Sequence, residues 1–158
     1  MNIYVTGPIG SDRKKAAQKL AEETGYDFLD FDAEIEKRDG RTIRRICMMM
    51  GEHEYRNKEY ELLNELAESG RSDKEGYVCS CSDGILFDPM CSELMKKGRI
   101  LIADADMSVD DLWEQAKNDT DLPYAFMSDP NENTKKKKFM ELYELRKNIY
   151  MKFTEVIE

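Results

Sequence analysis

Apolar residues along the chain occur in two patterns that alternate with each other. Some form short continuous runs rich in β-branched and aromatic residues, bounded by glycine or polar residues, which is typical of buried strands. Others recur three or four positions apart, which predicts helices with one buried face. The short runs predict strands at residues 3–6, 26–32, 77–81 and 100–103.

Helices are predicted between these runs and after the last of them. Ser11 and Asp12 are good N-caps for the first helix, and Gly25 ends it. Further helices are predicted at residues 33–38, 43–50, 52–68, 89–97 and 109–118, and from residue 134 to the C-terminus. Residues 71–76 and 119–133 are polar and predict loops. Alternating strands and helices predict an α/β fold with a parallel sheet, in which ligands lie at the carboxyl ends of the strands.

The length and net charge of the chain limit the number of domains and the kinds of partner that we expect. A chain of 158 residues with 41% hydrophobic residues is long enough for one domain with a real core. The net charge of −9 disfavours general nucleic-acid binding, because phosphate neutralisation needs a basic face. No apolar run approaches the roughly 20 residues that cross a bilayer, and the first residues lack a basic segment followed by an apolar one. We therefore expect a cytoplasmic protein without membrane or nucleic-acid partners.

The chain has four cysteines, Cys47, Cys79, Cys81 and Cys91, and one histidine, His53. Free thiols are the expected state in a reducing cytoplasm. A zinc site can be drawn from these residues, but the usual pairs of cysteines two to four residues apart are absent. A metal- or thiol-dependent function therefore ranks last among the alternatives.

The first strand, turn and helix form the context of a phosphate-binding loop. Such a loop follows the pattern G-x-x-x-x-G-K-[ST], whose backbone N–H groups and lysine hold phosphates and whose hydroxyl holds Mg²⁺. Gly7 fits, but Asp12, Arg13 and Lys14 replace the last glycine, the lysine and the hydroxyl. An ordinary tight turn before a capped helix is the alternative. The phosphate-binding candidates are Gly7, Gly10, Ser11, Asp12, Arg13 and Lys14.

Several segments together resemble the shikimate kinase family of P-loop kinases. Residues 25–36 are similar to G-x-x-F-x-D-x-D-x-x-I-E, and residues 39–43 to (E)G-x-(S/T)-I. Residues 51–59 are similar to G-E-x-x-F-R-x-x-E, and residues 146–150 to R-x-P-L-Y. The resemblance implies a three-layer α/β/α kinase-like fold in a single domain, with residues 119–133 as a lid-like loop. Because the chain ends at Glu158, we expect it to lack the family's last strand.

The resemblance also implies roles for single residues. Asp32 corresponds to the acid that contacts the shikimate hydroxyls and acts as a base, and Asp30 lies near the metal. Arg56 and Arg146 correspond to the arginines that hold the shikimate carboxylate, since arginine binds carboxylates in a forked geometry. Each has a structural alternative: Asp32 as an N-cap, Arg56 paired with Glu52 and Glu59, and Arg146 paired with acids on its own helix. Gly84 is a further substrate-binding candidate, and Arg13 a further catalytic one.

The residues that correspond to the nucleotide-binding part of the family's site depart from its pattern at several positions. Cys81, Ser82 and Asp83 replace a glycine triplet, and Gln115 and Leu122 replace arginines. Two functions therefore lead. The first is phosphoryl transfer from ATP with Mg²⁺ to a shikimate hydroxyl. The second is a non-catalytic relative that binds a small anion such as shikimate, or a protein partner, as a monomer or a dimer.

Overall fold

The computed structural model describes residues 1–69, 75–153 and 156–157. A parallel sheet runs through its centre in the order β2-β3-β1-β4-β5. Its strands are β1 (Ile3–Thr6), β2 (Asp27–Asp30), β3 (Tyr77–Ser80), β4 (Arg99–Ala103) and β5 (Val156–Ile157). The α/β fold with a parallel sheet is confirmed.

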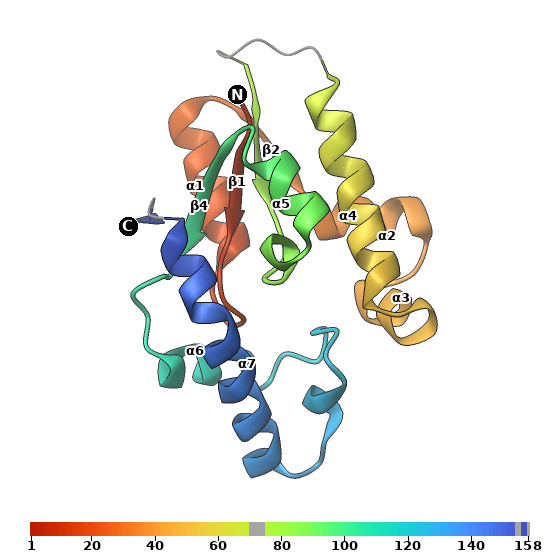
Figure 1. The fold of residues 1–158 in the computed structure, drawn as a ribbon, viewed down its shortest axis with the longest axis vertical. Coiled ribbons are helices and arrows are strands. Elements are labelled where there is room, and N and C mark those ends of the chain that lie inside the picture. Colours follow the sequence, from red (N-terminus) through yellow and green to blue (C-terminus); the bar gives the residue numbers. More distant parts are fainter. Residues whose placement is uncertain (70–74, 154–155, 158) are drawn as a thin grey trace.

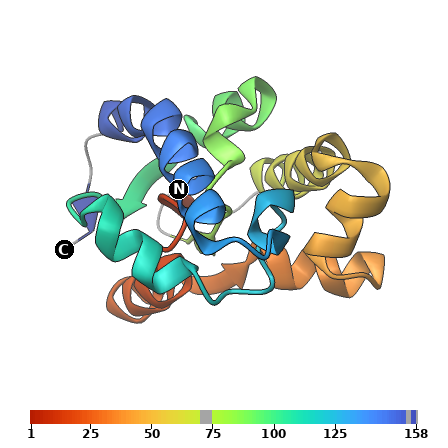
Figure 2. The same cartoon turned by 90° about the horizontal axis from the view of Figure 1, so that it is seen from below.

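Helices cover both faces of this sheet (Figure 1). They are α1 (Arg13–Thr24), α2 (Phe31–Asp39), α3 (Ile43–Met50), α4 (Glu52–Ala67), α5 (Pro89–Met95), α6 (Val109–Ala116) and α7 (Glu132–Lys152). Two short 3₁₀ turns, η1 (Ile85–Phe87) and η2 (Ala125–Ser128), complete the description. Figure 2 shows α5 and α7 on one side of the strands and α1 on the other.

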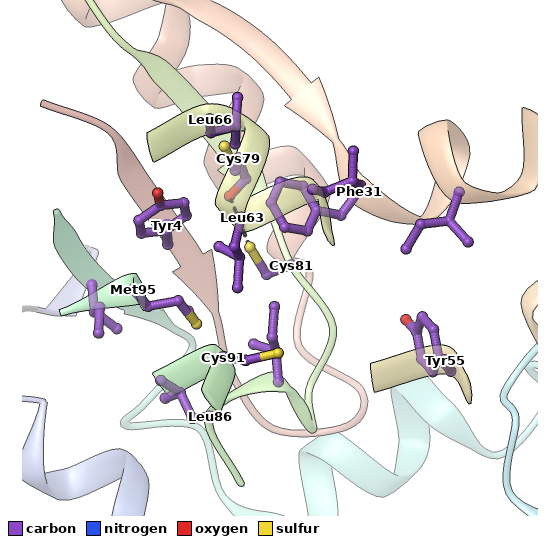
Figure 3. Packing of buried hydrophobic residues seen from close by; sticks show 14 of the residues in the cluster. Tyr4, Phe31, Tyr55, Leu63, Leu66, Cys79, Cys81, Leu86, Cys91 and Met95 are labelled. Atoms are coloured by element: carbon purple, nitrogen blue, oxygen red, sulfur yellow. Dashed lines mark hydrogen bonds between the residues drawn. The ribbon is translucent and has the colours of Figure 1, made fainter. Parts of the chain in front are cut away.

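Strand alternation divides the core between the two faces. Tyr4 of β1 packs with residues of α4, α5 and α7, whereas its neighbours Ile3 and Val5 pack with Ala17 and Ala21 of α1. Figure 3 shows the first of these clusters, with Tyr4 among residues from α4, α5 and β3. Both faces of the central strands are buried, which explains why β1, β3 and β4 are largely apolar runs.

A third apolar cluster joins α6 to α7. Trp113 of α6 packs against Phe139 of α7 with ring centroids 5.3 Å apart, and Leu122 is buried beside them. Leu122 belongs to residues 117–131, which we call the α6–α7 segment. In Figure 2 this segment leaves α6, approaches α3 and returns to α7. The cluster therefore fixes one end of a connection that crosses the carboxyl ends of the strands.

The structure corrects three predicted boundaries. The second strand ends at Asp30, so Asp32 lies in α2 and the N-cap of that helix is Asp30. The last helix ends at Lys152, and β5 pairs in parallel with β4, so a fifth strand exists where none was expected. The predicted loop at 71–76 falls largely outside the described residues. The loop at 119–133 contains η2, and α7 already begins at Glu132.

No described helix is long and apolar enough to traverse a bilayer.

Candidate ligand site

A cavity of about 280 Å³ opens at the carboxyl ends of the strands. Residues that follow β1, β2 and β3 form its floor, α3 and α4 form one wall, and the α6–α7 segment forms the other. Its lining residues are Arg13, Asp32, Glu36, Thr42, Ile43, Arg44, Tyr55, Arg56, Ser82, Asp83, Asp119, Asp121, Leu122, Pro123 and Tyr124. The cavity thus lies where the topology predicts a ligand, and it brings together the sequence candidates Arg13, Asp32 and Arg56.

Asp32 projects into the cavity from the first turn of α2. The hydroxyl of Tyr55 on α4 donates a hydrogen bond to its carboxylate. Burial raises the pKa of Asp32 to about 6, although the hydrogen bond from Tyr55 and the charge of Arg13 oppose the shift. A carboxyl group with a pKa in this range is suited to accept a proton from, or a hydrogen bond of, a ligand hydroxyl near neutral pH. The N-cap alternative for Asp32 is wrong, because Asp30 caps α2 through the N–H of Ala33.

Arg56 is a buried arginine on α4 that faces the same cavity. Its guanidinium pairs with Glu59, donates to Ser82 Oγ at 3.1 Å, and pairs with Glu52 at 2.7 Å. The predicted pairing with both glutamates is therefore present, and Arg56 also lines the cavity. Burial raises the pKa of Glu59 to about 7 against the opposing charge of Arg56 and a hydrogen bond from Ser82.

Gly84 lies between the two arginines that the sequence singled out. A Cβ at Gly84 would come within 2.1 Å of a guanidinium nitrogen of Arg56 and 3.2 Å of one of Arg146. Its φ of −98° is open to any residue, so the close approach of the arginines is what requires glycine here.

Asp83 places a buried negative charge in the site. Its buried carboxylate pairs with Arg146 at 2.6 Å, accepts a hydrogen bond from the Tyr124 hydroxyl, and lies 4.0 Å from Arg13. Tyr150 donates to the backbone carbonyl of Asp83. Arg146 therefore pairs across the fold with Asp83 rather than with acids on its own helix.

The charge on Asp83 is stabilised by these contacts. Burial by itself would raise the pKa of its carboxyl group. The charges of Arg13 and Arg146 and the hydrogen bond from Tyr124 outweigh that effect and hold the pKa below its usual range. Asp83 is thus an ionised acid inside the site.

Several donors of the turn between β1 and α1 are hydrogen-bonded to groups of the protein. The N–H and hydroxyl of Ser11 both donate to the carbonyl of Pro8, at 3.0 and 2.6 Å. The N–H of Asp12 donates to Asp104 Oδ2 at 2.9 Å, and the Asp12 carboxylate caps α1 through the N–H of Lys15. These contacts are those of a tight turn before a capped helix.

The two basic residues that follow this turn are also engaged. Arg13 donates to the carbonyls of Gly7 and Pro8 at 3.2 and 3.1 Å, and Lys14 pairs with Asp30 at 3.6 Å. Among the glycines, Gly10 has φ +92° and its Cβ would meet the carbonyl oxygen of Leu112 at 2.2 Å. Close packing of the turn against α6 therefore explains the glycine at position 10.

The cysteine and histidine candidates do not form a site. Cys79, Cys81 and Cys91 are buried in the core (Figure 3), where burial raises the pKa of their thiols. His53 lies exposed on α4. In the part of the chain that the structure describes, no three His, Cys, Asp or Glu side chains gather to hold a metal ion. The carboxylate of Asp30 caps α2 through the N–H of Ala33 and pairs with Lys14 at 3.6 Å.

Three residues of the site were missed by the sequence analysis. Tyr55 is the aromatic residue of the motif at 51–59, so its position was available, although its hydrogen bond to Asp32 was not. Arg44 and Tyr124 had no sequence signal. Arg44 donates to the carbonyl of Thr120 and to Ser128 Oγ, each at 2.6 Å, which attaches the α6–α7 segment to α3.

Comparisons with known proteins agree with the motifs. The family model described as shikimate kinase matches residues 10–158. The chain is 32% identical over 156 residues to a bifunctional shikimate kinase/3-dehydroquinate synthase of Thermotoga maritima, covering 99% of this chain and 29% of that protein. It is 30% identical to a shikimate kinase of Persephonella marina, covering 94% of this chain and 83% of that one.

The fold of the chain is also similar to that of a solved shikimate kinase structure. Shikimate kinase from Acinetobacter baumannii in complex with shikimate superposes with a TM-score of 0.80 and 27% sequence identity, covering 99% of this chain and 82% of that chain.

Proposed function

Because the chain belongs to the shikimate kinase family, we propose that its cavity binds a small hydroxylated metabolite, without efficient phosphoryl transfer from ATP. The observation that carries this proposal is the contrast between the two halves of the site. The ligand cavity contains Asp32 and Arg56 of the family motifs. In the turn at residues 7–14, the N–H groups of Ser11 and Asp12 and the guanidinium of Arg13 are bonded to the protein itself.

The cavity supports the binding half of the proposal. About 280 Å³ is close to the lower end of small-molecule pockets, which suits a single-ring compound. Asp32, with a pKa of about 6, offers an acceptor for a ligand hydroxyl, and Tyr55 orients its carboxylate. Ser82 and Thr42 add polar lining.

The residues of the turn do not fit ATP and Mg²⁺. A bound polyphosphate needs free backbone N–H groups, a cation directed at the phosphates and a ligand for Mg²⁺. Here the N–H of Asp12 is bonded to Asp104, the guanidinium of Arg13 is directed at loop carbonyls, and Lys14 cannot ligate a cation. Asp12 would also face the phosphates with like charge, which costs a few kcal/mol at close range. The turn in this conformation therefore supports no transfer of a phosphoryl group from ATP.

One observation favours a second candidate, an ATP-dependent kinase with a divergent loop. The raised pKa of Asp32 and its contact with the Tyr55 hydroxyl suit a general base that accepts the proton of an attacking hydroxyl. A kinase of this kind needs the turn at residues 7–14 to rearrange when nucleotide binds.

Calorimetric titration separates the candidates. Shikimate, its uncharged methyl ester and Mg-ATP are titrated separately into the protein and into Asp32→Asn. We expect heat from at least one ring compound, reduced in Asp32→Asn, and none from Mg-ATP. Binding of Mg-ATP would overturn the non-catalytic half of the proposal. Absence of heat from both ring compounds would overturn the binding half.

A further inference from the structure

Asp83 brings a carboxylate of the chain itself to the arginines of the site. It contacts Arg146 at 2.6 Å and Arg13 at 4.0 Å, and accepts the hydroxyl of Tyr124. Only 6% of its side chain is exposed, so these contacts are made away from bulk water. Charge-assisted hydrogen bonds of this kind are among the stronger polar contacts in proteins. Asp83 and Tyr124 line the cavity and Arg146 does not, so a ligand carboxylate would reach Arg146 only by displacing these contacts.

The three arginines that line the cavity are engaged as well. Arg13 donates to the carbonyls of Gly7 and Pro8, Arg44 to Thr120 and Ser128, and Arg56 to its two glutamates and Ser82. Each arginine that lines the cavity therefore already has acceptors from the protein. Acidic residues outnumber arginines along the lining of the cavity. They are Asp32, Glu36, Asp83, Asp119 and Asp121.

This balance of charge disfavours an anionic ligand. A carboxylate placed beside Arg146 would lie close to Asp83, and like charges at such range repel strongly in a partly buried site. Hydroxyl groups carry no such penalty, since they donate to carboxylates and accept from guanidiniums. The acids of the cavity thus favour hydroxyl donors over a second carboxylate.

We propose that Asp83 determines specificity: it occupies Arg146 in place of a ligand carboxylate, so that the cavity selects a hydroxylated ring compound that lacks a carboxylate. This inference rests on the proposed function, because it names the class of ligand for the same cavity. The competing interpretation is that Asp83 only neutralises a buried arginine and leaves ligand choice unaffected.

Binding to the unmodified protein gives the first test. Shikimate and its methyl ester share the ring and hydroxyls and differ in the carboxylate, so their affinities are compared by calorimetry at pH 7.5. We expect the ester to bind about tenfold more tightly, the scale of one contact to a charged group. Shikimate binding as tightly as the ester, or more tightly, would overturn the inference while leaving the proposed function intact.

A matched pair of variants assigns the effect to Asp83. Asp83→Asn keeps the shape and the acceptor for Tyr124 while removing the charge, so Arg146 becomes available to a ligand carboxylate. Asp121→Asn removes the same charge from an exposed position on the cavity lining and serves as the control. Circular dichroism checks that both variants fold, and the comparison in the unmodified protein remains decisive if Asp83→Asn does not.

The change in the ratio of the two affinities between the unmodified protein and each variant is the quantity to follow, because the extra bulk of the ester affects each ratio alike and cancels. In Asp83→Asn we expect it to shift toward shikimate by about tenfold, and in Asp121→Asn to shift by much less. An unchanged ratio in Asp83→Asn, or an equal shift in both variants, would contradict the inference. Failure of both compounds to bind the unmodified protein would instead contradict the proposed function.

Discussion

The carboxylate of Asp104, just after β4, accepts the backbone N–H of Asp12 at the N-terminus of α1, with 2.9 Å between the two atoms. Asp104 adopts a left-handed backbone conformation, with φ 53°. The contact joins the carboxyl end of β4 to the turn that follows β1. An acid of the chain is therefore bonded to an N–H at the helix end where a phosphate-binding loop would present its donors.

We expect Asp104→Ala to destabilise the protein by about 2 kcal/mol, because alanine loses this hydrogen bond and tolerates the left-handed conformation poorly. Asp104→Asn should cost much less, since asparagine adopts this conformation readily and its side-chain oxygen can accept the same N–H. Urea denaturation of the two variants checks the difference. Equal stability of both variants would show that the contact contributes little.

Asp32 should make the stability of the protein depend on pH. Its pKa is raised from 3.8 to about 6 in the fold, so the folded state binds more protons than the unfolded state between these values. Stability therefore falls as the pH rises through this window. Glu59, whose pKa is raised from 4.5 to about 7, contributes an overlapping fall.

We expect Asp32→Asn to remove the first contribution and to stabilise the protein by about 1–3 kcal/mol at pH 8, with little effect at pH 4. Asparagine can still accept the hydroxyl of Tyr55, so that contact remains possible. Thermal unfolding at a series of pH values measures the effect. A stabilisation equally large at pH 4 and pH 8 would contradict the assigned cause.

Most of the fold follows from the sequence, because its elements are bounded by local signals. The cap at Asp12, the left-handed Gly25 and the continuous apolar strands all act within a few residues. The end of β2 was placed two residues late, because the alternating acids at 30 and 32 extend the strand pattern while Asp30 caps α2. The strand β5 was missed because two residues carry no periodic signal.

The α6–α7 segment should be held over the cavity by Arg44. Its guanidinium contacts the carbonyl of Thr120 and the hydroxyl of Ser128, far apart from it in sequence. We expect Arg44→Ala to increase amide hydrogen exchange in residues 117–128 by local opening, with a small change in overall stability. Arg45→Ala, at the exposed neighbouring position, is the control and should leave this exchange unchanged. Similar exchange in both variants would mean that the hydrophobic contacts of Leu122 hold the segment.

Thiol reactivity should separate Cys47 from the other three cysteines. Cys79, Cys81 and Cys91 are buried, and burial raises the pKa of their thiols, so few reactive thiolates form. Cys47 is half-buried, with a pKa raised to about 11. With an aromatic disulfide reagent we expect one slow reaction in the native protein and all four thiols after denaturation. Rapid labelling of several thiols in the native protein would revive a thiol-dependent function.

The site was predictable only in part. The motifs identified Asp32, Arg56 and Arg146 because these residues are spaced as in the family. Helical spacing also predicted the pairing of Arg56 with Glu52 and Glu59. The partners of Asp32 and Arg146 come from distant segments, and sequence spacing carries no information about such contacts. The replacement of a family glycine by Asp83 was visible in the sequence, as a departure from the family pattern. Its pairing with Arg146, 63 positions away, emerged only from the fold.

We propose that the cavity binds a hydroxylated ligand without phosphoryl transfer from ATP. Acceptor-dependent release of ADP from Mg-ATP tests this proposal, with shikimate and its methyl ester at concentrations that saturate the cavity. Asp32→Asn serves as the control for activity that originates in this site. We expect ADP release at the background rate for the protein and the variant alike. Release that requires the acceptor and is lost in Asp32→Asn would contradict it.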